Sequence, residues 1–175
     1  FVVEGVRMFR EAPDEWIREV YVSETLLRKW EQEHDRESRE RIKKYQCEVL
    51  TDEVFRKVSD TQTPQGVLCV LAMPHYELAR RLEEDMADSS RPPLYVLLED
   101  LQDPGNLGTI LRAGEGAGVD GVIMTRRTVD IFNPKVIRAT MGSIYRVPFY
   151  IVDDLGGTVS LLRKSGVRVY AAHLD

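Results

Sequence analysis

The apolar positions of the chain alternate between two spacings. Short apolar runs rich in β-branched residues indicate strands, and apolar residues three or four positions apart indicate helices. The predicted strands are 17–23, 47–51, 67–72, 94–101, 121–125, 147–152 and 167–174. The predicted helices are 3–12, 24–45, 52–59, 75–90, 106–117, 133–145 and 155–164. Regular strand–helix alternation in the second half predicts an α/β fold, with helices on both faces of a parallel sheet.

The prolines Pro92 and Pro93 divide this pattern, because two prolines in a row cannot continue a helix and favour extended backbone. We predict a small α/β domain at residues 1–74, a linker helix with a Pro-rich boundary at 75–92, and a second domain at 93–175. Open parallel sheets bind their ligands beyond the carboxyl ends of the strands. The segments that follow the strands of the second domain are therefore expected to carry the chemistry.

The composition narrows the class of protein. Hydrophobic residues make up 43% and charged residues 30%, as in ordinary globular domains. No apolar run approaches the roughly 20 residues of a membrane span, so we expect no membrane partner. The histidines are scattered, and Cys47 and Cys69 lie in separate strand-like runs, so we expect neither a metal site nor a disulfide. Buried thiols are typical of a reducing compartment, which favours a cytoplasmic location.

The charge is unevenly distributed. Residues 1–91 contain 15 Lys and Arg against 20 Asp and Glu, whereas residues 92–175 contain nine of each. A net charge of −5 argues mildly against a nucleic-acid partner, which usually meets a basic surface. Within the second domain, however, Lys135, Arg138 and Arg146 are close in sequence. They are candidates for RNA contacts, with solvated surface charges as the equally weighted alternative.

A first motif, DPGNLGTILR, follows strand 94–101. Asp103 begins a turn, and Asn106 is predicted to cap a helix whose free amide groups form an anion site. Arg112 lies about one and two-thirds turns further on, within reach of a phosphate near the helix start. Glu99 and Asp100 complete an acidic cluster with Asp103. Such a cluster suits general acid–base catalysis, but turn formation and ion pairing are the favoured interpretation.

A second motif, NPKVIRATMGSIYRVP, begins at Asn133. Asparagine as a cap followed by Pro134 in the first turn favours a helix start at this point. The residues at 139, 140, 142 and 143 are small. They predict that this helix approaches another backbone closely.

Together the two motifs resemble the first two signature motifs of the SpoU (TrmH-like) RNA methyltransferases, members of the knotted SPOUT superfamily. The first domain, with VEG near its start and TPQGVLCVL near its end, is similar to the L30e-like substrate-binding domain of that family. The resemblance implies a parallel-sheet methyltransferase domain of the trefoil-knot fold with S-adenosylmethionine as cofactor. It implies methylation of a ribose 2′-hydroxyl in structured RNA, with ribosomal RNA favoured over transfer RNA, and a homodimer at full length.

Site residues follow from the resemblance position by position. Arg112 matches the catalytic arginine of the family, and Asn106 matches the motif asparagine that shapes the site. Ala172, His173 and Leu174 resemble the loop that contacts the adenosine of the cofactor.

The third family motif, a Gly-Asn-Glu-Gly-like segment followed by Ser-Leu-Asn, does not occur in the 175 residues. We therefore expect the fold to be cut off before the knot, and the chain by itself to bind cofactor poorly and to be inactive. The initial Phe1 suggests that residues are missing at that end as well.

Two other functions stay open at this point. The chain could act as a non-catalytic RNA- or ribosome-binding module that uses the same two domains. A nicotinamide-dependent oxidoreductase is a weaker alternative, since residues 116–121 spell GxGxxG. A dinucleotide site needs that motif to open a helix after a strand, whereas here it closes a predicted helix.

Overall fold

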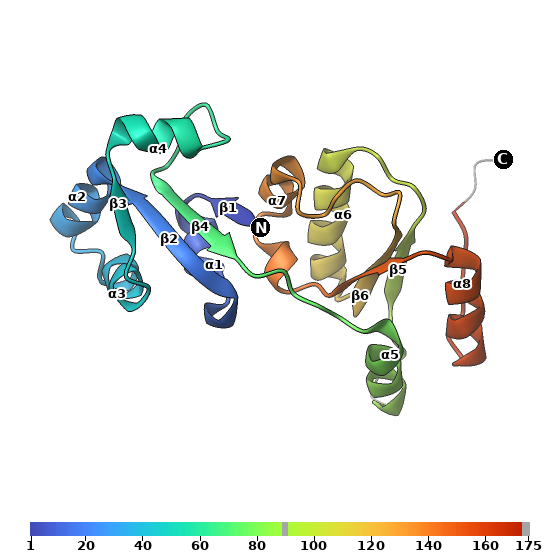
Figure 1. Ribbon diagram of the computed structural model, residues 1–175. Coiled ribbons are helices and arrows are strands. Elements are labelled where there is room, and N and C mark those ends of the chain that lie inside the picture. The colour runs from blue at the N-terminus through green and yellow to red at the C-terminus, as the bar shows by residue number, and fades with distance from the viewer. Residues whose placement is uncertain (89–90, 173–175) are drawn as a thin grey trace.

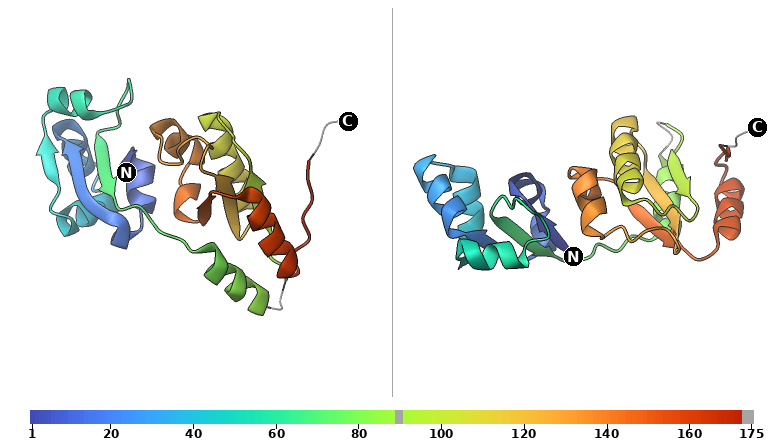
Figure 2. Two further views of the ribbon diagram at one scale, coloured as in Figure 1. Left: turned by 45° about the vertical axis from the view of Figure 1, so that its right-hand side comes forward. Right: turned by 90° about the horizontal axis from the view of Figure 1, so that it is seen from above.

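The computed structural model describes residues 1–88 and 91–172. Two separate sheets lie side by side, with the N-terminus between them (Figure 1). Two further views keep helix α8 (Leu155–Lys164) at the end of the molecule that is far from the first sheet (Figure 2). The α/β architecture predicted from the sequence is confirmed.

The first sheet has four strands in the order β1-β4-β2-β3. Its strands are β1 (Val2–Glu4), β2 (Ile17–Ser23), β3 (Glu48–Leu50) and β4 (Val67–Leu71). Strand β4 is antiparallel to both β1 and β2, whereas β2 and β3 are parallel. The helical elements of this half are α1 (Val6–Glu11), η1 (Asp14–Trp16), α2 (Glu24–Gln32), α3 (Arg36–Lys44) and α4 (Asp52–Val58).

Two helices of the first half are shorter than predicted. Gly5 has a φ of 101°, so helix 3–12 begins only at Val6 and the preceding residues form β1. The predicted helix 24–45 is two helices, because His34 takes the left-handed conformation with a φ of 54°. Periodicity of side chains continues across such a break, which is why the pattern did not reveal it.

The second sheet has three parallel strands in the order β5-β6-β7. Its strands are β5 (Tyr95–Leu98), β6 (Gly121–Thr125) and β7 (Phe149–Val152). The helical elements around it are α5 (Leu78–Ala87), α6 (Pro104–Ala117), α7 (Pro134–Thr140), η2 (Ser143–Tyr145) and α8. The predicted parallel sheet is confirmed.

Alternate residues of β6 bury their side chains on opposite faces of this sheet. Val122 and Met124 belong to the cluster that includes the buried residues of α6 and α7. Ile123 packs with Leu82 of α5 and Leu162 of α8. The sheet is therefore covered by helices on both faces, as the strand–helix alternation predicted.

The segment after α8 differs from the prediction. Residues 167–172 were expected to form most of a strand, but they are not paired with any strand in the described parts of the chain. Val167 and Val169 nevertheless pack against the buried cluster of Leu82, Ile123, Tyr150 and Leu162. Apolar alternation reports which side chains are buried, and it does not require backbone pairing.

The two halves share one apolar core. The largest cluster of buried residues combines side chains of the first sheet with those of α6, α7 and the second sheet. The rings of Phe1 and Phe132 lie 4.7 Å apart between their centroids, and Trp16 meets Tyr145 edge-on at 5.9 Å. The domain limits at residues 74 and 92 stay a prediction, because packing continues across them.

Candidate functional site

The loops at the carboxyl ends of β5 and β6 are joined by hydrogen bonds. The Thr125 hydroxyl donates to Asp100 Oδ1 at 2.8 Å and accepts from the Asp100 backbone N–H at 2.9 Å. Arg127 forms an ion pair with Asp100 at 2.6 Å. Asp100 is thus held in an ion pair, as favoured from the sequence, and Glu99 is exposed beside it.

Helix α6 starts from the first of these loops. Its cap is Asp103, whose Oδ1 accepts a hydrogen bond from the Asn106 backbone N–H at 2.6 Å. The prediction that Asn106 is the cap was wrong, because the helix already begins at Pro104, two residues before Asn106. Asn106 is exposed in that turn, with its side-chain amide oriented by no hydrogen bond in the described parts of the chain.

Arg112 lies further along the same helix. Leu107 and Leu111 are fully buried on the inner face of α6, and Arg112 is exposed on its outer side. Its guanidinium makes no hydrogen bond or ion pair with residues 1–88 or 91–172. Six residues separate it from Asn106, so the two side chains leave the helix about 120° apart. Arg112 is therefore a permanently charged group that is free to bind an anion.

Helix α7 carries the second motif against α6. Asn133 caps it by accepting a hydrogen bond from the Lys135 N–H at 2.9 Å, as predicted. A Cβ atom on Gly108 would lie 3.0 Å from the Val136 carbonyl oxygen, so α6 and α7 are in close backbone contact there. The helix ends at Thr140, earlier than predicted, because Met141 and Gly142 both take left-handed conformations.

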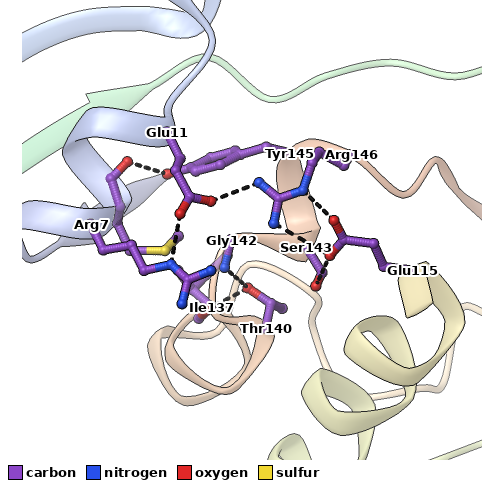
Figure 3. A network of polar contacts seen from close by, with 10 residues as sticks. Arg7, Glu11, Glu115, Ile137, Thr140, Gly142, Ser143, Tyr145 and Arg146 are labelled. Carbon is purple, nitrogen blue, oxygen red and sulfur yellow. Dashed lines mark hydrogen bonds and ion pairs between the residues drawn. The ribbon is translucent and has the colours of Figure 1, made fainter.

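The three cations proposed for RNA contacts are in different environments. Lys135 is exposed and has no partner among the described residues. Arg138 forms an ion pair with Asp60 of the first half at 2.7 Å. Arg146 forms ion pairs with both Glu11 and Glu115 (Figure 3). Their role in RNA binding stays a prediction, and two of the three already neutralise carboxylates of the same chain.

Comparison with known proteins places this architecture. Residues 93–175 match the SpoU rRNA Methylase family, and residues 1–69 match the MRM3-like substrate binding domain. The chain thus contains a SpoU methylase domain preceded by an MRM3-like substrate binding domain. The 23S rRNA (guanosine(2553)-2′-O)-methyltransferase RlmP of Bacillus subtilis is 35% identical over 130 residues, covering 74% of this chain and 48% of that protein. The mitochondrial rRNA methyltransferase 3 of Homo sapiens is 40% identical over 115 residues, covering 65% and 26%.

Solved structures of rRNA methyltransferases have the same fold. The crystal structure of an rRNA methyltransferase from Sinorhizobium meliloti superposes with a TM-score of 0.74 at 26% identity, covering 99% of this chain and 62% of that one. An AdoMet-bound structure of an rRNA methyltransferase from the same organism gives 0.70 at 24% identity, covering 94% and 58%. The present chain spans about half of the length of the Bacillus relative and about a quarter of the human one.

The residues expected to contact a cofactor in a SpoU methylase are described only in part. Ala172 is exposed and belongs to no strand, and His173 and Leu174 lie outside the described residues. A cavity of about 650 Å³ lies nearby, between Pro92–Tyr95 and Gly166–Tyr170. It lies against the start of β5 and not at the carboxyl ends of the strands. None of the loops that follow β5, β6 and β7 lines this cavity.

The glycines at 116–121 do not form a dinucleotide site. Gly118 takes the left-handed conformation, with a φ of 71°, and is the C-cap of α6. The following residues lead into β6, so the motif ends a helix where a nicotinamide-binding fold would begin one. This observation contradicts the geometry that the oxidoreductase alternative needs. Within residues 1–88 and 91–172 there is also no group of three His, Cys, Asp or Glu able to hold a metal, and no helix long and apolar enough to span a membrane.

Sequence patterns missed the partners of the charged residues. The Asp120 carboxylate, 6% exposed, accepts a hydrogen bond from Arg91 at 2.8 Å and one from the Leu94 N–H at 2.7 Å. Glu11 and Glu115 were likewise not singled out, although both contact Arg146. These partners are 26 to 135 residues apart in the chain. Local spacing carries no signal for such pairs.

Proposed function

We propose that this chain is part of an S-adenosylmethionine-dependent methyltransferase that modifies a ribose 2′-hydroxyl in ribosomal RNA. Residues 1–69 would bind the RNA, and residues 93–175 would provide catalytic groups. The observation that carries the proposal is Arg112 on the helix that follows the first strand of the parallel sheet. It is exposed and has no partner among residues 1–88 and 91–172. Relatives named as rRNA methyltransferases support the choice of RNA.

The proposed reaction requires deprotonation of the ribose 2′-hydroxyl, which is a very weak acid. An unperturbed ribose hydroxyl does not lose its proton readily near neutral pH, so its attack needs a base and a positioned methyl donor. Arg112 remains protonated and cannot be that base. Its guanidinium would hold the phosphate beside the target ribose and stabilise negative charge that develops on the hydroxyl oxygen.

S-adenosylmethionine would supply the methyl group. Its assignment is supported by the AdoMet-bound rRNA methyltransferase of Sinorhizobium meliloti, whose fold this chain shares. Ala172, His173 and Leu174 remain the proposed cofactor contacts. Isothermal titration of the full-length protein with S-adenosylhomocysteine would test binding without turnover.

A homodimer and a cytoplasmic location are further proposals. The dimer rests on the family resemblance, and the location rests on two unpaired cysteines, Cys47 and Cys69, of which Cys69 is buried. Light scattering on the full-length protein would reveal the dimer as twice the chain mass. Cell fractionation with specific antibodies would test the location.

Transfer of a labelled methyl group tests the proposed reaction. The full-length protein is incubated with labelled S-adenosylmethionine and unmodified ribosomal or transfer RNA, and the products are digested to nucleosides. Arg112→Ala should abolish formation of the 2′-O-methylated nucleoside while leaving the fold intact. Arg163→Ala is the matched control, because Arg163 on α8 is also exposed and without a described partner.

The binding-module alternative predicts a different result. A non-catalytic protein would retain RNA affinity, yet neither RNA pool would gain label with the wild type. If label enters only transfer RNA, the proposed 2′-O-methylation is supported and ribosomal RNA as the substrate is contradicted. Equal activity of wild type and Arg112→Ala would overturn the assignment of Arg112.

A further inference from the structure

A single guanidinium connects the first half of the chain to helix α6. Arg146 Nη1 lies 2.7 Å from Glu11 Oε2 at the end of α1. The Nε and Nη2 atoms of the same side chain donate to the two carboxylate oxygens of Glu115 on α6, the second at 3.3 Å. Figure 3 shows Arg146 between the two carboxylates. We call Glu11, Arg146 and Glu115 the interdomain clasp.

Further contacts on both sides hold the clasp. Arg7 donates to Glu11 at 2.7 Å, and the Ser143 hydroxyl donates to Glu115 at 2.5 Å. Hydrogen bonds to Glu115 and Glu11 raise the pKa of Arg146. The Arg146 hydrogen bond in turn lowers the pKa of Glu115. Burial raises the pKa of Glu11, but hydrogen bonds from Arg146 and Arg7 outweigh burial and lower it, so all three groups stay charged near neutral pH. A network of alternating charges with several hydrogen-bond donors restricts the positions of its side chains more than an isolated surface ion pair does.

The clasp borders a packed contact between the two domains. The Tyr145 hydroxyl, one residue before Arg146, is buried and donates to the Met8 carbonyl oxygen at 3.1 Å. Gly142 has a φ of 95°, and a Cβ atom there would collide with the Glu11 carboxylate. The turn between α7 and η2 is therefore shaped to admit the end of α1.

Helix α6 connects the clasp to the proposed catalytic arginine. Glu115 follows Arg112 by three residues, so their Cα atoms are separated by about 4.5 Å along the helix axis. A carboxylate fixed at 115 restrains the position of this end of α6. Through Arg146, that position is tied to α1 of the substrate-binding domain.

We propose that Arg146 is a positioning residue: the interdomain clasp sets the orientation of the substrate-binding domain relative to Arg112. This inference rests on the proposed function, because it concerns where RNA held by the first domain meets the catalytic helix. It replaces direct RNA contact as the role of Arg146. A guanidinium that already uses three nitrogen atoms on two carboxylates would have to release them before it could bind a phosphate.

The two roles predict opposite effects for Glu11→Gln in the full-length protein. If the clasp positions the domains, this change lowers kcat roughly tenfold or more, because small misplacements of reacting groups are costly. The Kd for ribosomal RNA should stay within about twofold, as for an ordinary surface change. If Arg146 contacts RNA, loss of the competing carboxylate strengthens RNA binding and leaves kcat unchanged, which would overturn the proposal.

Arg146→Lys and a double variant sharpen this test. Lysine keeps the charge but offers one point donor, so it cannot serve Glu11 and Glu115 together, and kcat should fall as in Glu11→Gln. Combining Arg146→Lys with Glu11→Gln should cause little further loss, since both remove one interaction. Additive losses would count against the clasp. Glu53→Gln is the matched control, because Glu53 pairs with Lys57 inside α4 and crosses no interface.

A distance measurement makes the proposal independent of catalysis. Spin labels are placed at Val54 on α4 and Leu161 on α8, both exposed, in a Cys47→Ala background. The wild-type clasp should give one narrow distance distribution, which broadens or shifts in Glu11→Gln and Arg146→Lys. An unchanged distribution would overturn the clasp. A broadened one in a protein that transfers no methyl group would support the clasp and contradict the proposed function.

Discussion

A Cβ atom on Gly108 would lie 2.9 Å from the carbonyl carbon of Ala139 and still closer to the Ala139 Cβ atom. Gly108 belongs to the first of the two motifs that resemble those of the SpoU methyltransferases, and Ala139 belongs to the second. Their contact fixes α6 on α7 and thereby places the loops that follow β5 and β6 beside the second motif. The predicted close approach of small residues is confirmed, and Gly108 is the residue that permits it.

Gly108→Ala should destabilise the protein by about 1–3 kcal/mol, because the added methyl group overpacks a contact made largely of backbone. Gly116→Ala is the matched control on the same helix. Its Cβ would have nothing within 4 Å, so it should stabilise the fold by up to about 1 kcal/mol. Urea unfolding followed by circular dichroism measures both values. Equal effects at the two positions would contradict the importance of the α6–α7 contact.

The cap of α6 separates two roles that the sequence assigned to one residue. Asp103→Ala should cost about 1 kcal/mol of folding stability, because it removes the acceptor for the Asn106 N–H. Asn106→Ala should leave folding stability nearly unchanged, since its side chain is exposed and hydrogen-bonded to no described residue. Thermal unfolding of the two variants checks this order. A larger loss of stability in Asn106→Ala than in Asp103→Ala would indicate that Asn106 is the cap.

Local patterns were sufficient for most of the second domain. Strand β6 and helix α8 lie within the predicted ranges, because each combines an apolar pattern with a clear start or stop signal. Asn133 with Pro134 marked the start of α7 correctly for the same reason. The cap of α6 was misplaced by three residues because Asp103, Pro104 and Asn106 are all compatible with a helix start.

The interactions that orient the site were not accessible in this way. Glu11 is 135 residues from Arg146, and charged residues without periodic spacing look alike in a sequence. The positive charge of Arg138 and Arg146 favours RNA contacts in the sequence, whereas the fold brings an acidic partner to each of them. Likewise, that Arg112 has no partner among the described residues depends on which residues surround it in space. Sequence resemblance identified Arg112, and the structure supplied its environment.

The two cysteines should differ in reactivity. Burial raises the pKa of Cys69 to about 12, so almost no thiolate forms near pH 8, and the sulfur is also inaccessible. Cys47 is only partly buried, although burial raises its pKa as well. With Ellman's reagent, one thiol should react in the native protein and the second only after unfolding. Cys47→Ala should remove the native reaction, and rapid labelling of that variant would contradict the burial of Cys69.

Acid should weaken the fold through Asp120. Burial raises the pKa of this carboxyl, but hydrogen bonds from Arg91 and Leu94 outweigh burial and hold the pKa below its ordinary value of 3.8. A carboxylate with a lowered folded pKa contributes stability that is fully present well above 3.8 and is lost as pH falls through the folded value. Stability should therefore decline below about pH 4, where the unfolded chain takes up the proton first.

Substitution isolates this contribution from that of other acidic groups. Asp120→Asn should lower the free energy of unfolding by about 2 kcal/mol at neutral pH, because it removes a buried carboxylate bonded to Arg91. The difference from wild type should shrink as pH falls through the lowered pKa of the folded protein, since the native carboxylate then becomes protonated as well. Asp153→Asn is the control: Asp153 pairs with Arg126, but both side chains are at least 70% exposed, so water replaces the lost contact. Urea unfolding at several pH values measures these differences. If the difference in the free energy of unfolding between Asp120→Asn and wild type does not change with pH, Asp120 stabilises the fold through its shape and not through its charge.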